Sequence, residues 1–204
     1  NAEEFGAWIR EVRSSCEIVV SEKRPVPLYQ HMIVGEDIFD LYAPTGRGKL
    51  NPELVAATRD SGMRGGRGSR SWNREVHVRR ESRPSTLISL DRAGLLPGIT
   101  FIFSRAGCED AVRQILSTRI TLTTRSEAAE IESYVDEVIE LLPPEDAIVL
   151  GAAAWKRGLM RGIAAHHAGM LPLMKETVEH LFSRGLVKMV YATETLALGI
   201  NMPA

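Results

Sequence analysis

The sequence predicts an α/β fold built around a parallel sheet. From Ser85 onward, short apolar runs of strand length alternate with longer stretches in which apolar residues recur at helical spacing. The run ITFIF (99–103) is continuous, a pattern typical of a strand covered on both faces, and LVKMVY (186–191) is the last clear strand. Strands that alternate with helices in this way pair in parallel through right-handed crossovers.

The first third of the chain is less regular. A helix is predicted over residues 2–13, with four apolar side chains on one face: Phe5, Trp8, Ile9 and Val12. Residues 16–20 read as a short buried strand, and two prolines keep residues 24–28 extended, as in a connection between domains. One or two strands are expected in residues 28–41. Residues 50–71 are expected to be a mobile loop, because they hold too few large apolar residues to offset the entropy of ordering.

The elements after residue 84 follow from apolar periodicity. The predicted helices span residues 86–93, 107–116, 126–142, 146–159 and 172–182. The predicted strands span residues 99–103, 162–165 and 186–191. The pair Pro143-Pro144 ends the third of these helices.

Composition narrows the class of protein. The 204 residues are 44% hydrophobic and 25% charged, with a net charge of −1, so no global charge points to nucleic acid or to a membrane surface. Residues 59–83 are an exception, with eight arginines and three acids.

Cys16 and Cys108 are far apart and not in a CxxC pattern, which favours a reducing cytoplasm over a disulfide framework or a zinc site. No apolar run is long enough to span a bilayer. We expect both ends, Asn1 and Ala204, to be cuts.

Parallel sheets bind ligands in the loops that follow the carboxyl ends of their strands. After residues 99–103 come Ser104, Arg105 and Gly107. The hydroxyl, the guanidinium and the start of a helix can together hold a phosphate. The alternative is an ordinary helix cap by Ser104 beside a solvated arginine.

After residues 162–165 come His166, His167 and Gly169. Adjacent histidines point in different directions and no third ligand lies at a useful spacing, which argues against a metal site. One of the histidines fits a hydrogen-bonded core position. The other, beside Gly169, can approach a nucleic-acid backbone where a bulkier neighbour would interfere.

After residues 186–191 come Thr193, Glu194 and Thr195, followed by Gly199 and Asn201. Two hydroxyls and a helix start can bind a phosphodiester, and the glycine and asparagine form a tight turn whose amide can meet a sugar hydroxyl. A capped helix followed by a turn accounts for Thr193, but not for so specific a string.

These three segments resemble one protein family. Residues 192–204 (ATETLALGINMPA) resemble the fifth motif of superfamily-two helicases in the form found in superkiller/antiviral-type DExH helicases. Residues 164–172 (AAHHAGMLP) resemble the segment before it in that family, and residues 99–111 (ITFIFSRAGCEDA) resemble its fourth motif. Residues 1–9 look like the stretch after the family's Ser-Ala-Thr motif. With the Gly/Arg insert, the likeness is greatest to the actinobacterial HelY-type members.

The resemblance implies two RecA-like domains that clamp a single strand and close on ATP. Residues 1–27 would be the tail of the first domain and the interdomain passage. Residues 28–83 would begin the second domain, with a mobile Gly/Arg-rich insert at about 50–83, and residues 84–204 would continue it, truncated after the fifth motif. The family's strand-binding face maps onto Ser104, Arg105, His167, Gly169, Thr193, Glu194 and Thr195. Gly199 and Asn201 would lie toward the nucleotide.

Several of the family's catalytic motifs are absent from these residues. The sequence has no G-x-x-x-x-G-K-[ST], no Asp-Glu-x-His and no Gln-x-x-Gly-Arg-x-Gly-Arg. ATP and Mg²⁺ would therefore act in the parent protein, and we expect the isolated chain not to hydrolyse ATP. The implied partners are single-stranded RNA or DNA and the missing first RecA-like domain, with no membrane. The alternative is a non-catalytic nucleic-acid-binding module that uses residues 59–83 as an electrostatic arm, unless that segment is only a solvated loop.

Overall fold

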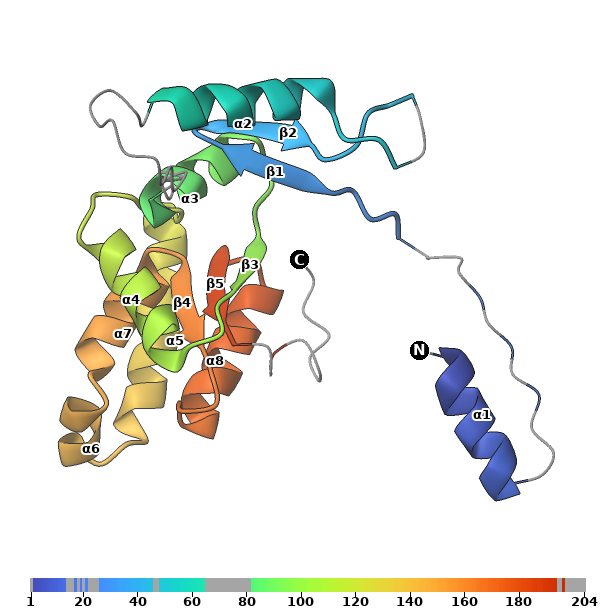
Figure 1. The fold of residues 1–204 in the computed structure, drawn as a ribbon. Coiled ribbons are helices and arrows are strands. Elements are labelled where there is room, and N and C mark those ends of the chain that lie inside the picture. Colours follow the sequence, from blue (N-terminus) through green and yellow to red (C-terminus); the bar gives the residue numbers. More distant parts are fainter. Residues whose placement is uncertain are drawn as a thin grey trace, which may run out of the picture.

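The computed structural model describes residues 2–13, 17, 19, 21, 26–45, 48–64, 82–193 and 196 (Figure 1). In chain order the elements are α1 (Ala2–Arg13), β1 (His31–Val34), β2 (Asp37–Asp40), α2 (Pro52–Arg64), α3 (Arg83–Arg92), β3 (Gly98–Phe101), α4 (Arg105–Leu116), α5 (Arg125–Glu140), α6 (Pro144–Val149), α7 (Ala152–Met160), β4 (Ile163–His166), α8 (Pro172–Ser183) and β5 (Met189–Ala192). The predicted α/β fold with a parallel sheet is confirmed.

The parallel sheet has the strand order β3-β5-β4, so β5 lies in the centre. Phe101 of β3 and His166 of β4 are both in register with Ala192 of β5. Helices α4 to α7 connect β3 to β4, and α8 connects β4 to β5 (Figure 1). The carboxyl ends of all three strands therefore lie at one edge of the sheet.

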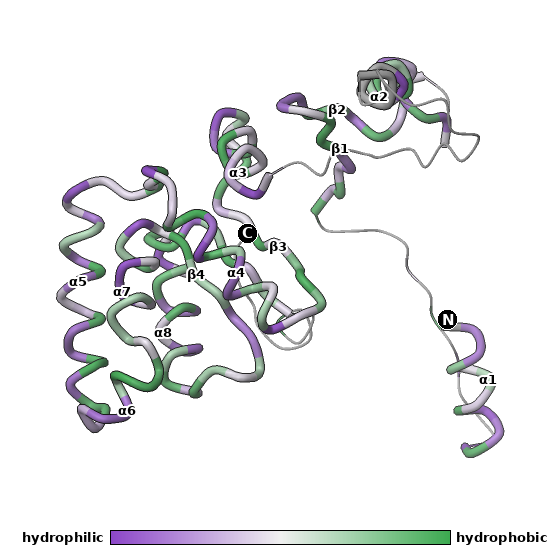
Figure 2. The backbone as a smooth tube through the Cα atoms, turned by 60° about the vertical axis from the view of Figure 1, so that its left-hand side comes forward, coloured by the Kyte–Doolittle hydropathy of each residue, from purple (hydrophilic) through white to green (hydrophobic). Residues whose placement is uncertain are grey.

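The core has one apolar layer on each face of this sheet. Alternate side chains of β5 enter opposite layers: Met189 and Tyr191 pack with residues of α3 and α4, while Val190 and Ala192 pack with residues of α5, α7 and α8. Burial raises the pKa of Tyr191 to about 12. Figure 2 shows hydrophobic and hydrophilic positions alternating along α5, as expected for a helix with one buried face.

One sequence prediction is wrong at β3. The run at residues 99–103 was expected to be covered on both faces, but no residue of β3 is fully buried in the described structure, where it is also an edge strand. Phe101 is 47% exposed and Phe103 is 86% exposed. The similar run at residues 186–191 includes the central strand β5, which is buried throughout. An apolar run thus predicts a strand, whereas its place in the sheet depends on pairing with distant residues.

The single helix predicted at residues 146–159 is two helices. Gly151 adopts a left-handed conformation (φ 66°) and separates α6 from α7. The apolar residues before this break do not enter the core, since Ile148 is 81% exposed and Val149 is 86% exposed. Their spacing continues that of α7, which is why the sequence pattern suggested one helix.

Strands β1 and β2 form an antiparallel hairpin in the region where one or two strands were expected. Gly35 has a positive φ (69°) in the turn, a conformation that costs glycine little. The hairpin is joined to α3 by a hydrogen bond of 2.9 Å from the Ser89 hydroxyl to the carbonyl of Glu36.

The loop expected at residues 50–71 is wrong over Pro52–Arg64, which form α2. Two local signals begin this helix: Pro52 occupies its first position, and the Asn51 side chain accepts the backbone N–H of Glu53 at 3.0 Å. Leu54 is buried, and α2 contacts both strands of the hairpin. Packing against the hairpin thus holds a helix that the sparse apolar content did not predict. Residues 65–81 lie outside the described residues.

Helix α1 is confirmed as predicted. Its Phe5 and Trp8 rings lie 5.8 Å apart, and both side chains, with Val12, are exposed. Of the predicted strand at residues 16–20 the structure describes only residues 17 and 19, and neither is in a strand. Of the extended connection at 24–28 it describes residues 26–28, which form no helix or strand. Of the helices that the structure describes, none combines the length and apolar content needed to cross a membrane.

Candidate functional site

Three polar segments meet at the carboxyl edge of the sheet. Pairing continues one residue past the strands: the N–H of Ile102 donates to the carbonyl of Ala192 at 2.8 Å, and the N–H of Thr193 donates to the carbonyl of His166 at 3.2 Å. The described residues predicted for the site are Ser104, Arg105, His167, Gly169 and Thr193, and all follow these strand ends. Glu194, Thr195, Gly199 and Asn201 lie outside the described residues.

Ser104 caps α4. Its hydroxyl oxygen accepts the backbone N–H of Gly107 at 3.2 Å, which leaves the hydroxyl proton able to donate to a ligand. Gly107 allows this helix start to lie close to the strand end, because a Cβ there would meet Cγ2 of Ile102 at 2.8 Å. The glycine of this segment therefore serves packing.

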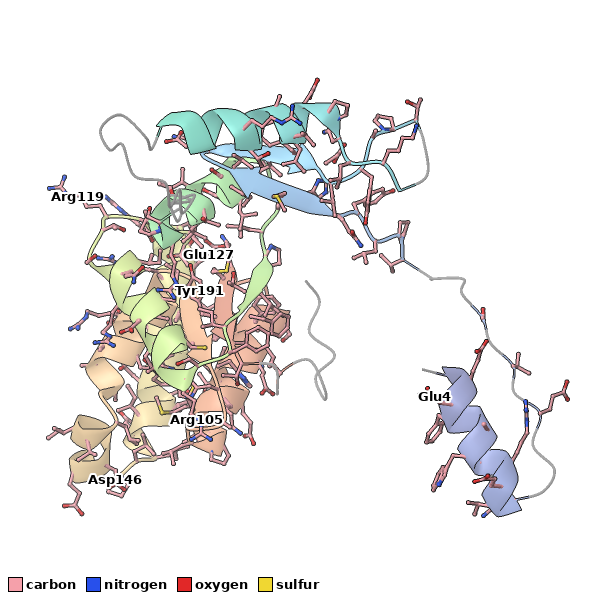
Figure 3. The ribbon with its side chains drawn as sticks, viewed as in Figure 1. Glu4, Arg105, Arg119, Glu127, Asp146 and Tyr191 are labelled. Atoms are coloured by element: carbon pink, nitrogen blue, oxygen red, sulfur yellow. The ribbon has the colours of Figure 1, made fainter. Side chains whose placement is uncertain are left out.

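Arg105 occupies the first position of α4 and is exposed, near the lower end of that helix in Figure 3. It forms no salt bridge with any described residue. Its stem runs beside the turn after β4, since a Cβ on Gly169 would lie 3.3 Å from Cδ of Arg105. The first and second of the three segments are thus brought together at Gly169. The guanidinium is left available for an anion.

His167 is 7% exposed, and both of its ring nitrogens are hydrogen-bonded. Nδ1 accepts the backbone N–H of Gly169 at 3.2 Å, and Nε2 lies 2.9 Å from Oε1 of Glu109. A ring that accepts at Nδ1 and meets a carboxylate at Nε2 is neutral and carries its proton on Nε2. The imidazole thus fastens the turn after β4 to α4, while Ala168 and Gly169 remain exposed.

His166 points to the other layer of the protein. Its Nε2 lies 2.7 Å from Oε1 of Glu179 on α8, and its Nδ1 is buried without a hydrogen-bond partner among the described residues. His166 is 4% exposed. It is therefore the core histidine of the pair, although His167 is buried as well.

Sequence reasoning missed the two carboxylates that hold the histidines. Glu109 lies four residues after Arg105, so both fall on one face of α4, a spacing that could have identified it. Glu179 is thirteen residues from His166 on a different element, and no sequence pattern links the two.

The edge also borders a cavity of about 260 Å³ between α4, α7 and β4. Glu109, His167 and Gly169 contribute to its wall, together with Trp155, whose buried Nε1 has no partner among the described residues. In the part of the chain that the structure describes, no group of three or more His, Cys, Asp and Glu side chains is arranged to hold a metal ion. A hydroxyl, a guanidinium and exposed backbone are groups suited to bind phosphate and sugar oxygens.

Comparison with known proteins gives similarities along the whole chain. It is 48% identical over 217 residues to the probable helicase HelY of Mycobacterium tuberculosis, covering 100% of this chain and 24% of that protein. It is 38% identical over 236 residues to the chloroplastic DExH-box ATP-dependent RNA helicase DExH15 of Arabidopsis thaliana, covering 100% of this chain and 20% of that protein. It is 34% identical over 223 residues to Superkiller complex protein 2 of Homo sapiens, and the match covers 100% of this chain and 17% of that protein. The chain therefore spans a quarter or less of the length of these relatives. No family model matches it.

Proposed function

Because this chain belongs to the superkiller-type DExH helicases, we propose that it is part of an ATP-dependent helicase that translocates on single strands and unwinds duplexes. In this proposal residues 1–27 are the tail of the first RecA-like domain and the interdomain passage. Residues 28–83 begin the second RecA-like domain, and residues 84–204 continue it. The exposed apolar face of α1 would then be covered by the first domain.

The proposed strand path crosses the carboxyl edge of the sheet. The observation that supports it is the convergence of Ser104, the 167–169 turn and Thr193 through the backbone bonds of three parallel strands. Ser104 can donate its hydroxyl proton to a phosphate, and Arg105 supplies an unpaired guanidinium beside it. Contacts of this kind reach phosphate and sugar, so binding would be largely indifferent to base sequence.

His167 has an indirect role in this proposal. A ligand could engage its ring nitrogens only by displacing Glu109 or Gly169. We therefore assign the strand contact in this turn to the exposed backbone of Ala168 and Gly169. His167 then keeps that backbone in place, with Thr193, Glu194 and Thr195 continuing the path along the next strand end.

ATP and Mg²⁺ would be used by the whole protein. Gly199 and Asn201 are the residues of this chain proposed to face the nucleotide. The phosphate loop, the Asp-Glu-x-His and the arginine-rich motif that the family uses for hydrolysis are absent from the 204 residues. We therefore propose that the isolated chain does not hydrolyse ATP. RNA-stimulated phosphate release by the purified chain, above a buffer control, would contradict this.

The strand path is tested by Arg105→Gln in the full-length protein. We expect several-fold weaker binding to single-stranded RNA or DNA and a salt slope smaller by about 0.7, the value for one phosphate contact on a single strand. The matched control is Arg92→Gln, which removes the same charge from a guanidinium that is paired with Glu36 at 3.8 Å. If both variants and the wild type bind single strands with equal affinity, the proposed strand path is wrong. Parallel titrations with RNA and DNA of one sequence decide which strand is preferred.

A further inference from the structure

A second cavity, of about 340 Å³, lies at the opposite edge of the sheet from Ser104. Its walls are the segment that leads into α5 and the last turn of α7. The charged and hydroxyl side chains that line it are Arg125, Arg157, Arg161, Thr121, Thr123 and Thr124. The N–H of Leu122 donates to the carbonyl of Arg161 at 3.0 Å, just before β4 begins, which places the cavity at the amino end of that strand.

The distance between the two edges follows from α4. Arg105 begins this helix and Arg119 follows its end, and Figure 3 shows the two residues toward opposite ends of α4. A helix of 12 residues is about 18 Å long at a rise of 1.5 Å per residue. The cavity is therefore separate from the strand path, yet a single strand could reach both.

The walls of the cavity are held by internal hydrogen bonds. Nη1 of Arg161 donates to the carbonyls of Leu116 and Thr118 at 3.3 and 2.9 Å. The Thr123 hydroxyl donates to the carbonyl of Met160 at 2.5 Å. These bonds fix the guanidinium plane of Arg161 and leave its remaining N–H groups for other partners. A ligand would thus meet a preformed site.

The charges at this cavity are unbalanced. No acidic side chain lines it, and within the described residues Arg125, Arg157 and Arg161 form no salt bridge. By contrast, the guanidiniums of Arg113 and Arg184 pair with Asp110 and Glu130.

The position of Arg125 adds to this imbalance. It is the first residue of α5, where the positive end of the helix dipole disfavours a cation. The nearby carboxylate of Glu127 is already engaged by the Thr124 N–H and by Lys188. Positive charge that no acidic side chain of the cavity neutralises favours the binding of an anionic ligand.

We propose that this arginine cavity binds phosphate groups of a nucleic-acid strand that extends beyond the carboxyl edge. Arg125 and Arg157 are exposed and contact the phosphodiester, while Arg161 is the fixed floor of the site. The inference deepens the proposed function, because it extends the same nucleic-acid path to a second surface. Phosphate is favoured over a base contact because guanidinium forks match its oxygens and no aromatic side chain lines the cavity.

The test uses the full-length protein and single-stranded RNAs of increasing length. The variant is Arg125→Gln with Arg157→Gln, because Arg161 also supports the fold. The control is Arg113→Gln with Arg184→Gln, which changes the net charge equally at guanidiniums that are already paired. For long RNAs we expect the salt slope of the variant to fall by about 1.4, or about 0.7 for each lost contact. Short RNAs that reach only the carboxyl edge should bind the variant and the wild type equally.

Each alternative outcome has one meaning. An unchanged slope for long RNAs, or an equal fall in the control pair, overturns the inference. Loss of poly-glutamate binding in the variant, with RNA binding intact, would mean an acidic protein partner instead and would also overturn it. Saturable binding of inorganic pyrophosphate that long RNA fails to compete would assign the cavity to free phosphates and would also overturn the inference. Arg105→Gln in the same titrations reports on the strand path alone, so failure of the path and failure of the cavity are distinguished.

Discussion

Oε1 of Glu109 lies 2.9 Å from Nε2 of His167, and this bond joins the first turns of α4 to the turn that follows β4. The opposite ring nitrogen accepts the N–H of Gly169, so only the neutral ring with its proton on Nε2 makes both bonds. The two segments are far apart in sequence, and the imidazole fixes their relative position at the proposed strand path.

Glu109→Ala should therefore weaken single-strand binding although Glu109 contacts no strand itself. We expect a several-fold loss of affinity, because the 167–169 turn loses its tie to α4, with the salt slope unchanged. Glu109→Gln retains an oxygen acceptor and should restore most of the affinity. Fluorescence anisotropy with labelled RNA measures both, and Glu137→Ala, on the exposed face of α5, is the control. An affinity of Glu109→Ala equal to or above that of the wild type would contradict the positioning role.

Gly107→Ala should destabilise the fold. The added Cβ would meet Cγ2 of Ile102 at 2.8 Å, and a β-branched side chain has little freedom to move aside. Overpacking of this kind costs about 1–3 kcal/mol, which outweighs a helix-propensity gain of about 1 kcal/mol.

Urea unfolding measures this difference, with Gly98→Ala as the matched control, because the nearest atoms to a Cβ at Gly98 lie at 3.6 Å or more. In an Ile102→Ala background the penalty of Gly107→Ala should largely vanish. A Gly107→Ala protein at least as stable as the wild type would refute the packing account.

The stability contributed by Glu127 should depend on pH. Its carboxylate accepts the N–H of Thr124 at 2.6 Å and contacts Nζ of Lys188, and these bonds lower its pKa from 4.5 to about 2. Because the folded state favours the ionised form, the contribution is complete above pH 4.5 and is lost as the pH falls toward 2.

Glu127→Gln should accordingly cost about 1 kcal/mol near neutral pH, the usual value of a helix cap, and progressively less below pH 4.5. Urea unfolding at a series of pH values gives the curve, and Glu137→Gln should show no such trend. A cost that stays constant into the acid range would rule out this linkage.

Cys108 should be unreactive in the folded protein. Its side chain is fully buried, and burial raises the pKa of the thiol, with the charge of Glu109 acting in the same direction. The thiolate, which is the reactive form, is therefore disfavoured and shielded. Peptide mapping after iodoacetamide treatment should find Cys108 modified only when denaturant is present. If iodoacetamide modifies Cys108 in native buffer as fast as in denaturant, the thiol is not shielded by the fold and this prediction is wrong.

The parts of the fold that the sequence predicted correctly are those that local pattern determines. Apolar residues at helical spacing correctly indicated the buried faces of α5 and α8. The apolar run at residues 186–191 likewise indicated the buried strand β5. The edge position of β3 was not predictable, because it depends on which strand pairs with which. The break at Gly151 was hidden by apolar residues that continue the helical spacing into solvent. The strand-end rule placed Ser104, His167 and Thr193 together, whereas the Glu109–His167 bond depends on the packing of α4 against β4.

Strands β3 and β4 form no pairs with each other, and both depend on β5, which follows them in the chain. Gly98 pairs with Met189, a partner roughly 90 residues later. A ribosome that adds about 5–20 residues per second therefore completes β3 about 5–18 s before β5, and β4 about 1–5 s before it. During that interval the backbone groups of β3 and β4 lack the one strand with which they pair among the described residues. The newly made domain is thus most exposed to chaperones and to misassociation just before β5 emerges.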